Sequence, residues 1–344
     1  MKVGSLVYTT DQGLSILAKS FHDNKVVTDV MVVRHGSRKE HDEWYPDSKR
    51  IYSLSSQEEL EHIYTFCKSM DVMLFFETPF IWQLIPYCQK HNIKTALMVM
   101  YECMPHTLPY LPDLYLCPSL LDKQYYPQRN SIYLPIPVDV RWKERTTVKT
   151  FVHNAGHGGL KGRNGTAEFL HALRHIKQPI NVILRSQEPI PNIDTFFQRD
   201  TLHGNVQKLD VRVGNFDYEN LYQEGEVFVF PEKFNGLSLP LQEAYASGMV
   251  VLATDRYPNN TYIPQAGLIP TIGHITNRIS SRCNTYNEAV IQSEDIAACM
   301  DSWYNKDVSQ YSQYAKEWAQ LMSWQVLKPR YTQVLTDLIQ SKYK

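Results

Sequence analysis

The sequence predicts an α/β protein built from two doubly wound, Rossmann-like domains that face each other across a cleft. Three observations lead to this prediction. The chain has 344 residues, more than one ordinary domain holds. Short apolar runs alternate with amphipathic segments, as in a parallel sheet covered by helices on both faces. This alternation stops at a polar stretch, residues 141–149, and then starts again.

In the first half, expected strands and helices alternate as far as Met100. The expected strands are residues 3–8, 27–33, 51–54, 72–76 and 95–100. The expected helices are residues 14–22, 55–70 and 81–91. The second helix opens with Ser56 and, three residues later, Glu59, which is the spacing of a capping box.

The second half repeats the pattern and ends in helices. Its expected strands are residues 150–153, 181–184, 227–230 and 250–253, and its expected helices are residues 166–175, 239–247, 296–304 and 311–340. We expect the last helix to break near Pro329. The domains expected from this are residues 1–145 and 146–315, with a C-terminal helix at 316–344 that returns to the N-terminal domain.

Composition restricts the function classes. A net charge of -1 provides no general attraction to nucleic acid or anionic lipid. The six cysteines show no paired metal-ligand spacing, and the N-terminus has no signal-peptide pattern. No apolar stretch reaches membrane-spanning length, so we expect no transmembrane segment and a soluble, cytoplasmic protein.

The strongest chemical pattern lies in residues 229–255. A strand ends at Pro231, Gly236 lets the main chain approach a ligand, and a helix begins near Leu239. Glu243 lies about one turn into that helix, where its carboxylate can accept hydrogen bonds from the vicinal hydroxyls of a ribose. An ordinary strand–helix–strand unit with a surface glutamate fits the same pattern.

This stretch resembles the retaining family-4 glycosyltransferases (glycosyl transferases group 1). The residues that carry the resemblance are Pro231, Gly236, Leu239-Pro240, Glu243-Ala244, Gly248 and Thr254-Asp255. The resemblance implies the GT-B fold, a nucleotide-sugar donor site in the C-terminal half and a ribose contact at Glu243. It also implies donor contacts at Asn235, Gly236 and Leu237. The family has a glutamate that contacts the sugar where this chain has Asn235.

A second stretch, residues 151–170, is rich in glycine. Five glycines precede a helix, and their exposed amides suit a diphosphate, with Lys161 and Arg163 as cations for the departing nucleotide. A flexible loop with incidental basic residues is the alternative. The resembling family ends this loop in Arg-Lys-Gly, where this chain has Arg163-Asn164-Gly165. The family also often has an arginine at the position of His157. We therefore take His157 and Gly158 as donor contacts, and Lys161 as the cation that replaces the family's missing basic residue.

The first half contributes weaker candidates. Gly13 lies in the turn after the first strand, where it either contacts the donor or simply forms a tight turn. Glu102 follows the strand that ends at Met100, and we take it as a catalytic candidate beside its structural alternative. The resembling family often has a histidine at this place. This chain has Tyr101-Glu102 instead, so no catalytic histidine is transferred to it. The loop 255–264 resembles one near the donor in some of these enzymes.

Taken with the resemblance, the sequence predicts transfer of a hexosyl group from a nucleoside diphosphate sugar to an acceptor hydroxyl. We expect a UDP-sugar such as UDP-glucose, no cofactor, and retention of configuration, which the resemblance implies. No Asp-x-Asp ends an apolar strand, so we expect no metal. The N-terminal domain would bind the acceptor: a glycan, a small molecule or a hydroxymethylated pyrimidine in DNA. An epimerase or phosphorylase, and a non-catalytic sugar-nucleotide-binding protein, are the alternatives.

Overall fold

A computed structural model describes residues 1–138, 141–156, 162–190, 193, 204–217 and 220–343. The chain forms two compact units. Unit 1 comprises Met1–Pro137, Arg278–Asn284 and Trp324–Lys344, and unit 2 comprises Val138–Asn277 and Thr285–Ser323. By packing, the chain passes from one unit to the other after residues 137, 277, 284 and 323, whereas the boundaries expected from the sequence were 145 and 315.

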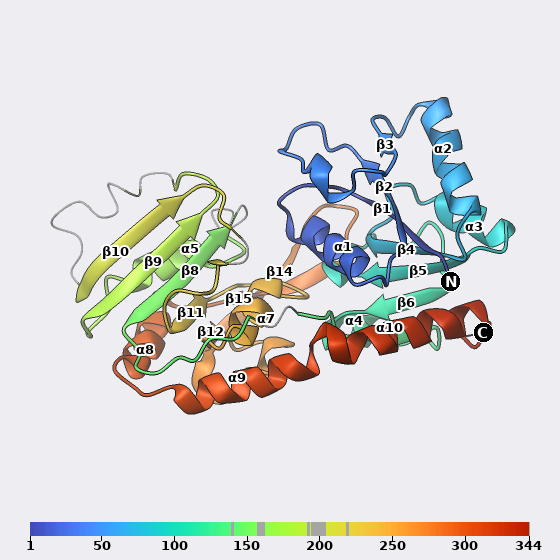
Figure 1. Ribbon diagram of the computed structural model, residues 1–344. Coiled ribbons are helices and arrows are strands. Elements are labelled where there is room, and N and C mark those ends of the chain that lie inside the picture. The colour runs from blue at the N-terminus through green and yellow to red at the C-terminus, as the bar shows by residue number, and fades with distance from the viewer. Residues whose placement is uncertain (139–140, 157–161, 191–192, 194–203, 218–219, 344) are drawn as a thin grey trace. The chain divides into compact units, whose positions relative to one another are not determined.

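Unit 1 is built on a parallel sheet (Figure 1). Its described strands are ordered β3-β2-β1-β4-β5-β6-β7. They are β1 (Val3–Val7), β2 (Asp29–Val33), β3 (Arg50–Ile51), β4 (Val72–Glu77), β5 (Lys94–Val99), β6 (Leu114–Cys117) and β7 (Ser131–Tyr133). Its α-helices are α1 (Gly13–Asp23), α2 (Gln57–Lys68), α3 (Leu84–Lys90), α4 (Leu120–Tyr125) and α10 (Trp324–Ile339).

Helices cover both faces of this sheet, because successive side chains of a strand point in opposite directions. Phe75 of β4 belongs to the core that α2 and α3 complete. Its neighbour Phe76 meets the ring of Phe21 on α1 edge-to-face. Phe21 in turn contacts Trp324 and Tyr331, which places α10 on the same side as α1.

Unit 2 has a second parallel sheet, whose described strands are ordered β10-β9-β8-β11-β12-β13 (Figure 1). They are β8 (Thr150–Gly156), β9 (Ile180–Ser186), β10 (Val206–Val213), β11 (Val227–Phe230), β12 (Val250–Thr254) and β13 (Leu268–Ile269). The described α-helices are α5 (Thr166–Ala172), α7 (Leu239–Ala246), α8 (Ser293–Trp303) and α9 (Ser309–Leu321). A ribbon of β14 (Gly273–Arg278) and β15 (Thr285–Val290) follows β13.

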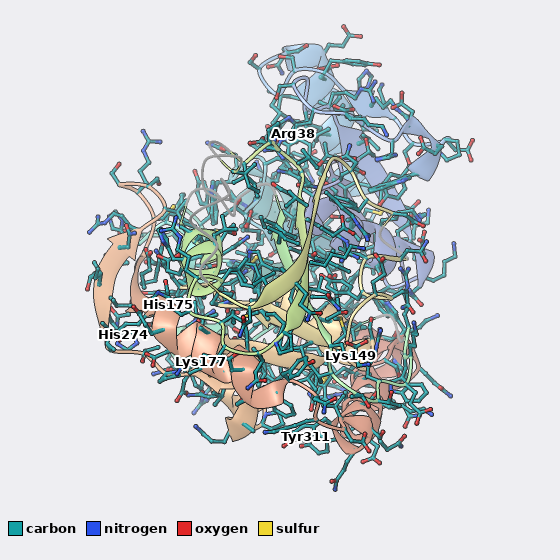
Figure 2. All side chains as sticks on the ribbon, turned by 90° about the vertical axis from the view of Figure 1, so that its left-hand side faces the viewer. Arg38, Lys149, His175, Lys177, His274 and Tyr311 are labelled. Carbon is teal, nitrogen blue, oxygen red and sulfur yellow. The ribbon has the colours of Figure 1, made fainter. Side chains whose placement is uncertain are left out.

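The same alternation divides the core of unit 2 into two layers. Val227 and Val229 of β11 pack with residues of α5 and α8. Phe228 and Phe230 pack on the other face with residues of α7. Figure 2 views this unit with the end of α5 beside α8, where the ring of the labelled His175 lies 3.5 Å from the Glu294 carboxylate.

The structure departs from the sequence expectation in several elements, and α4 is among those not expected. The expected strands did not include β6, β7, β10 or β13, nor the ribbon; β10 is an edge strand with many polar side chains, which gives a weak apolar signal. The expected break near Pro329 is wrong, because Pro329 lies inside α10. The interruption falls instead between α9 and α10, at Met322 and Ser323.

We predict that Tyr331→Phe destabilises the protein by about 1–3 kcal/mol, the cost of leaving buried polar groups without a partner. The Tyr331 hydroxyl is buried and lies 3.2 Å and 3.1 Å from the carbonyl oxygens of Leu134 and Pro135, so one donor serves both. Urea denaturation measures the loss. Tyr52→Phe, at an exposed ring of unit 1, is the control and should change stability by less than about 0.5 kcal/mol. Equal effects would contradict the assigned role of the Tyr331 hydroxyl.

Candidate functional site

The strand order of unit 2 reverses between β8 and β11. From β8 the chain continues through β9 and β10 on one side, and from β11 through β12 and β13 on the other. Ligands of open parallel sheets bind outside the carboxyl ends of the strands at such a reversal. We call residues 157–165 the β8 loop and residues 231–238 the β11 loop. Both follow strands at this reversal, so the two strongest sequence patterns share one edge of the sheet (Figure 1).

The two loops are in direct contact, through main-chain atoms and through the side chain of Arg163. Gly165 has a φ of 69°, and a Cβ atom on it would lie 2.0 Å from the carbonyl oxygen of Pro231. The Lys233 amide donates to the Arg163 carbonyl at 2.8 Å, and Arg163 Nε donates to the Phe234 carbonyl at 2.9 Å. Only glycine allows the first of these approaches.

A buried histidine fixes the same junction from within the sheet. His153 Nδ1 lies 2.8 Å from the Val229 carbonyl oxygen, and Nε2 lies 2.8 Å from the Thr166 hydroxyl at the start of α5. A carbonyl oxygen can only accept, so Nδ1 carries the proton and Nε2 accepts from Thr166. Burial lowers the pKa of His153 to about 4, which keeps the ring neutral. The sequence analysis did not single out this residue.

The β8 loop is described only in part. The predicted site residues His157, Gly158 and Lys161 lie outside the described residues. Asn164, which stands where the resembling family has lysine, donates from Nδ2 to the Ala155 carbonyl at 3.0 Å. Its side chain therefore ties the loop to the strand that it follows.

The β11 loop is shaped by its own side chains. Asn235 Oδ1 accepts from the amides of Leu237 at 3.3 Å and Ser238 at 3.0 Å. Asn235 is half-buried, while Gly236 and Leu237 are buried. Ser238 precedes α7 with a φ of 51°. The side-chain oxygen of Asn235 is thus used inside the loop, and its amide nitrogen is the group suited to a ligand.

Glu243 lies on α7, where the sequence predicted it. Its carboxylate is half-buried and accepts from the hydroxyl of Tyr222 at 2.9 Å. Tyr222 precedes β11 and is buried, so it holds the carboxylate from the protein side. The sequence analysis missed Tyr222, because nothing in its local pattern connects it with α7.

A buried ion pair lies beneath the β11 loop. Glu232 and Arg256 are 0% and 6% exposed, and Arg256 Nη2 donates to Glu232 Oε1. The same oxygen accepts from the Ser238 hydroxyl at 2.6 Å and from Asn259 Nδ2 at 2.8 Å. The sequence analysis named the loop 255–264, which supplies Arg256 and Asn259, but did not find Glu232.

The two candidates in unit 1 differ in exposure. Gly13 is the exposed first residue of α1 and follows β1, which lies beside β4 where the order of that sheet reverses. Glu102 is only 1% exposed. Burial and the nearby Glu102 charge raise the pKa of Asp122 to about 7. Glu102 therefore belongs to a buried acidic group, and its accessibility does not favour direct contact with a substrate.

Two general findings complete the description. Within the described ranges, no group of three or more His, Cys, Asp or Glu side chains is arranged to hold a metal ion. No helix in the described part of the chain is long and apolar enough to cross a membrane.

Solved structures resemble this chain, although no protein-family model and no curated protein matches its sequence. Anabaena HepE in complex with UDP and glucose superimposes with a TM-score of 0.70 at 9% identity, covering 98% of this chain and 99% of that one. Sucrose-phosphate synthase from Thermosynechococcus elongatus gives 0.66 at 13% identity, covering 99% and 100%. The lipopolysaccharide outer core galactosyltransferase WaaB gives 0.61 at 12% identity, covering 99% and 100%.

At these identities the similarity concerns the fold. It extends over nearly the whole chain in each comparison. The described strand orders and helices form two Rossmann-like α/β domains. The predicted fold class is therefore confirmed: the chain has the GT-B fold.

We predict that Gly165→Ala destabilises unit 2 more than Gly156→Ala. Both glycines have a left-handed φ, of 69° and 61°, so each alanine costs about 1–2 kcal/mol for its backbone conformation. Only at Gly165 does the new Cβ overlap the Pro231 carbonyl, and such overpacking adds about 1–3 kcal/mol. Urea denaturation of both variants measures the difference. Equal losses would show that the two loops separate without cost.

Proposed function

We propose that this chain is a glycosyltransferase that moves a hexosyl group from a UDP-sugar to an acceptor hydroxyl, with retention of configuration and without a metal ion. The observation that carries the proposal is the placement of Glu243 on α7 next to two joined loops at the strand-order reversal. HepE, solved in complexes with UDP, UDP-glucose, and UDP and glucose, supports the same donor here.

Glu243 is the proposed ribose contact. A carboxylate offers about four lone-pair positions, so it can accept from Tyr222 and from ribose hydroxyls at the same time. The bond from Tyr222 restricts the rotation of the carboxylate before the nucleotide binds. The ribose then meets an acceptor that is already oriented, which lowers the entropy cost of binding.

The β8 loop is the proposed diphosphate site. The departing nucleoside diphosphate gains negative charge as the glycosidic bond breaks, and positioned cations stabilise that charge. The bond from Arg163 Nε to the Phe234 carbonyl orients the guanidinium, and we propose this cation as a phosphate contact. Lys161 and the loop amides at His157 and Gly158 complete this proposal.

Asn235 is the proposed sugar contact. Its Oδ1 is engaged by the amides of Leu237 and Ser238, so the side chain offers its Nδ2 as a donor. It would therefore hydrogen-bond the oxygen of one sugar hydroxyl without bringing charge to the site.

The acceptor is proposed to be a hydroxyl compound that binds unit 1.

We predict that Glu243→Ala weakens UDP binding by about 1.5–3 kcal/mol, the range for hydrogen bonds to a charged group. Isothermal titration calorimetry with UDP and with UDP-glucose measures the change. Glu317→Ala, an exposed glutamate on α9, is the matched control and should bind like the unsubstituted protein.

Three outcomes would revise the proposal. If the Glu243→Ala variant binds UDP as tightly as the unsubstituted protein does, the proposed ribose contact is refuted. Binding of another nucleoside diphosphate in place of UDP would correct the donor base. Binding of a UDP-sugar without hydrolysis or transfer across an acceptor panel would favour the non-catalytic sugar-nucleotide-binding alternative.

We also predict that turnover persists after metal ions are removed. Within the described residues no His, Cys, Asp or Glu cluster fits a metal ion, and cations of the β8 loop are proposed to stabilise the leaving group. Donor hydrolysis is measured after dialysis against EDTA, with and without added manganese. Loss of activity that manganese restores would contradict the metal-independent mechanism.

A further inference from the structure

We infer that the buried pair Glu232–Arg256 is a positioning device for the β11 loop, which fixes Asn235 for selection of the donor sugar. This inference rests on the proposed function. Neither residue contacts the donor in this assignment, because both side chains are enclosed beneath the loop. Their effect passes through hydrogen bonds to the loop.

The Glu232 carboxylate closes the loop on itself. Glu232 lies near the beginning of the loop, and its Oε1 accepts at 2.6 Å from the hydroxyl of Ser238, the last loop residue. The same oxygen accepts at 2.8 Å from Asn259 Nδ2, which belongs to the neighbouring loop 255–264. One carboxylate thus joins both ends of the β11 loop to a second loop.

Arg256 links this carboxylate to Asn235. Its Nη2 donates both to Glu232 and, at 2.6 Å, to the main-chain carbonyl of Asn235. Its Nη1 donates to the Tyr257 carbonyl at 3.0 Å, and its guanidinium lies 5.2 Å from the ring centre of Phe234. Arg256 is therefore held on several sides, and it holds the peptide from which the Asn235 side chain projects.

The energetics favour positioning over stability as the role of this pair. Removing two charges from water carries a large penalty, and buried ion pairs are often no more stabilising than apolar side chains of the same size. An apolar pair, however, has no directed bonds to the Ser238 hydroxyl and the Asn235 carbonyl. Directed bonds are what a loop needs to hold one geometry before its ligand arrives.

The location of the charge also has a consequence for specificity. The carboxylate of the β11 loop is at Glu232, facing inward, while the half-buried Asn235 is neutral. The ligand side of the loop therefore discriminates between sugars by the direction of an N–H group. That direction depends on the peptide that Arg256 holds. The Glu243–Tyr222 contact is separate, so nucleotide affinity should not depend on the pair.

The test uses Arg256→Lys, which keeps the positive charge beside Glu232. Lysine has one nitrogen in place of the planar guanidinium, whose Nη1 bonds Tyr257 while Nη2 bonds Glu232 and Asn235. We expect turnover of UDP-sugar to fall about tenfold or more, as for loss of a hydrogen bond to a charged group, with altered preference between two UDP-sugars. The affinity for UDP should stay within about twofold, since its proposed ribose contact is untouched. Hydrogen exchange of the peptide 234–239 should rise in the ligand-free protein, while that of α5 should not.

The matched control is Arg185→Lys. Arg185 is also buried, and it bonds to Glu224, Asn154 and the Leu221 carbonyl, none of which belongs to the β11 loop. The inference is overturned if Arg256→Lys leaves turnover and exchange unchanged. It is also overturned if turnover, UDP affinity and melting temperature fall together, as expected for a merely structural role.

A second variant keeps the inference testable if the Arg256→Lys variant does not fold. The pair Glu232→Gln with Arg256→Gln removes both charges together, so neither is left buried alone, and it should show the same separation of turnover from UDP affinity. If the unsubstituted protein binds no nucleoside diphosphate, the proposed function fails. The exchange comparison on the ligand-free protein still decides whether the pair holds the loop.

Discussion

The approach of Gly165 to the Pro231 carbonyl is the constraint on which the candidate site depends. Parallel strands place the β8 and β11 loops at one edge, but neighbouring loops make contact only where a side chain does not keep them apart. Gly165 removes that obstacle. Two further bonds join the loops: the Lys233 amide donates to the Arg163 carbonyl, and the Arg163 side chain donates from Nε to the Phe234 carbonyl. His153 joins β8 to β11 and to the start of α5 below these loops, so the junction is bonded on both sides.

The fold was predictable where the chain has strong apolar runs. Buried central strands such as β4, β11 and β12 carry almost uninterrupted apolar residues, and the alternation with helices defines a parallel sheet. Exposed edges lack this signal, so β10 was missed. At Pro329 the sequence predicted a helix break where the helix in fact continues. A proline removes one helical hydrogen bond, and packing of Tyr331 and Leu335 in the core of unit 1 compensates within α10.

The candidate site was predictable only as far as local sequence reaches. The helix that carries Glu243 and the glycine that permits a close turn are encoded within a few residues. The partners of these groups are not. Tyr222 precedes Glu243 by 21 positions, and Arg256 follows Glu232 by 24, without any period that relates them. The first pair is set by the packing of Tyr222 with residues of α7, and the second by the pairing of β11 with β12. A single sequence displays neither.

In the proposed function, the distribution of charge at the site follows from the different demands of binding and catalysis. The proposed ribose contact is a strong acceptor on a regular helix, where the Tyr222 hydroxyl donates to the Glu243 carboxylate. A reacting sugar requires fixed dipoles around it, because groups that must reorient during the reaction stabilise the transition state less. Irregular loops do not supply fixed dipoles by themselves. In our proposal the buried Glu232–Arg256 pair meets this need: its bonds hold the loop, while the neutral amide of Asn235 is the group offered to the sugar.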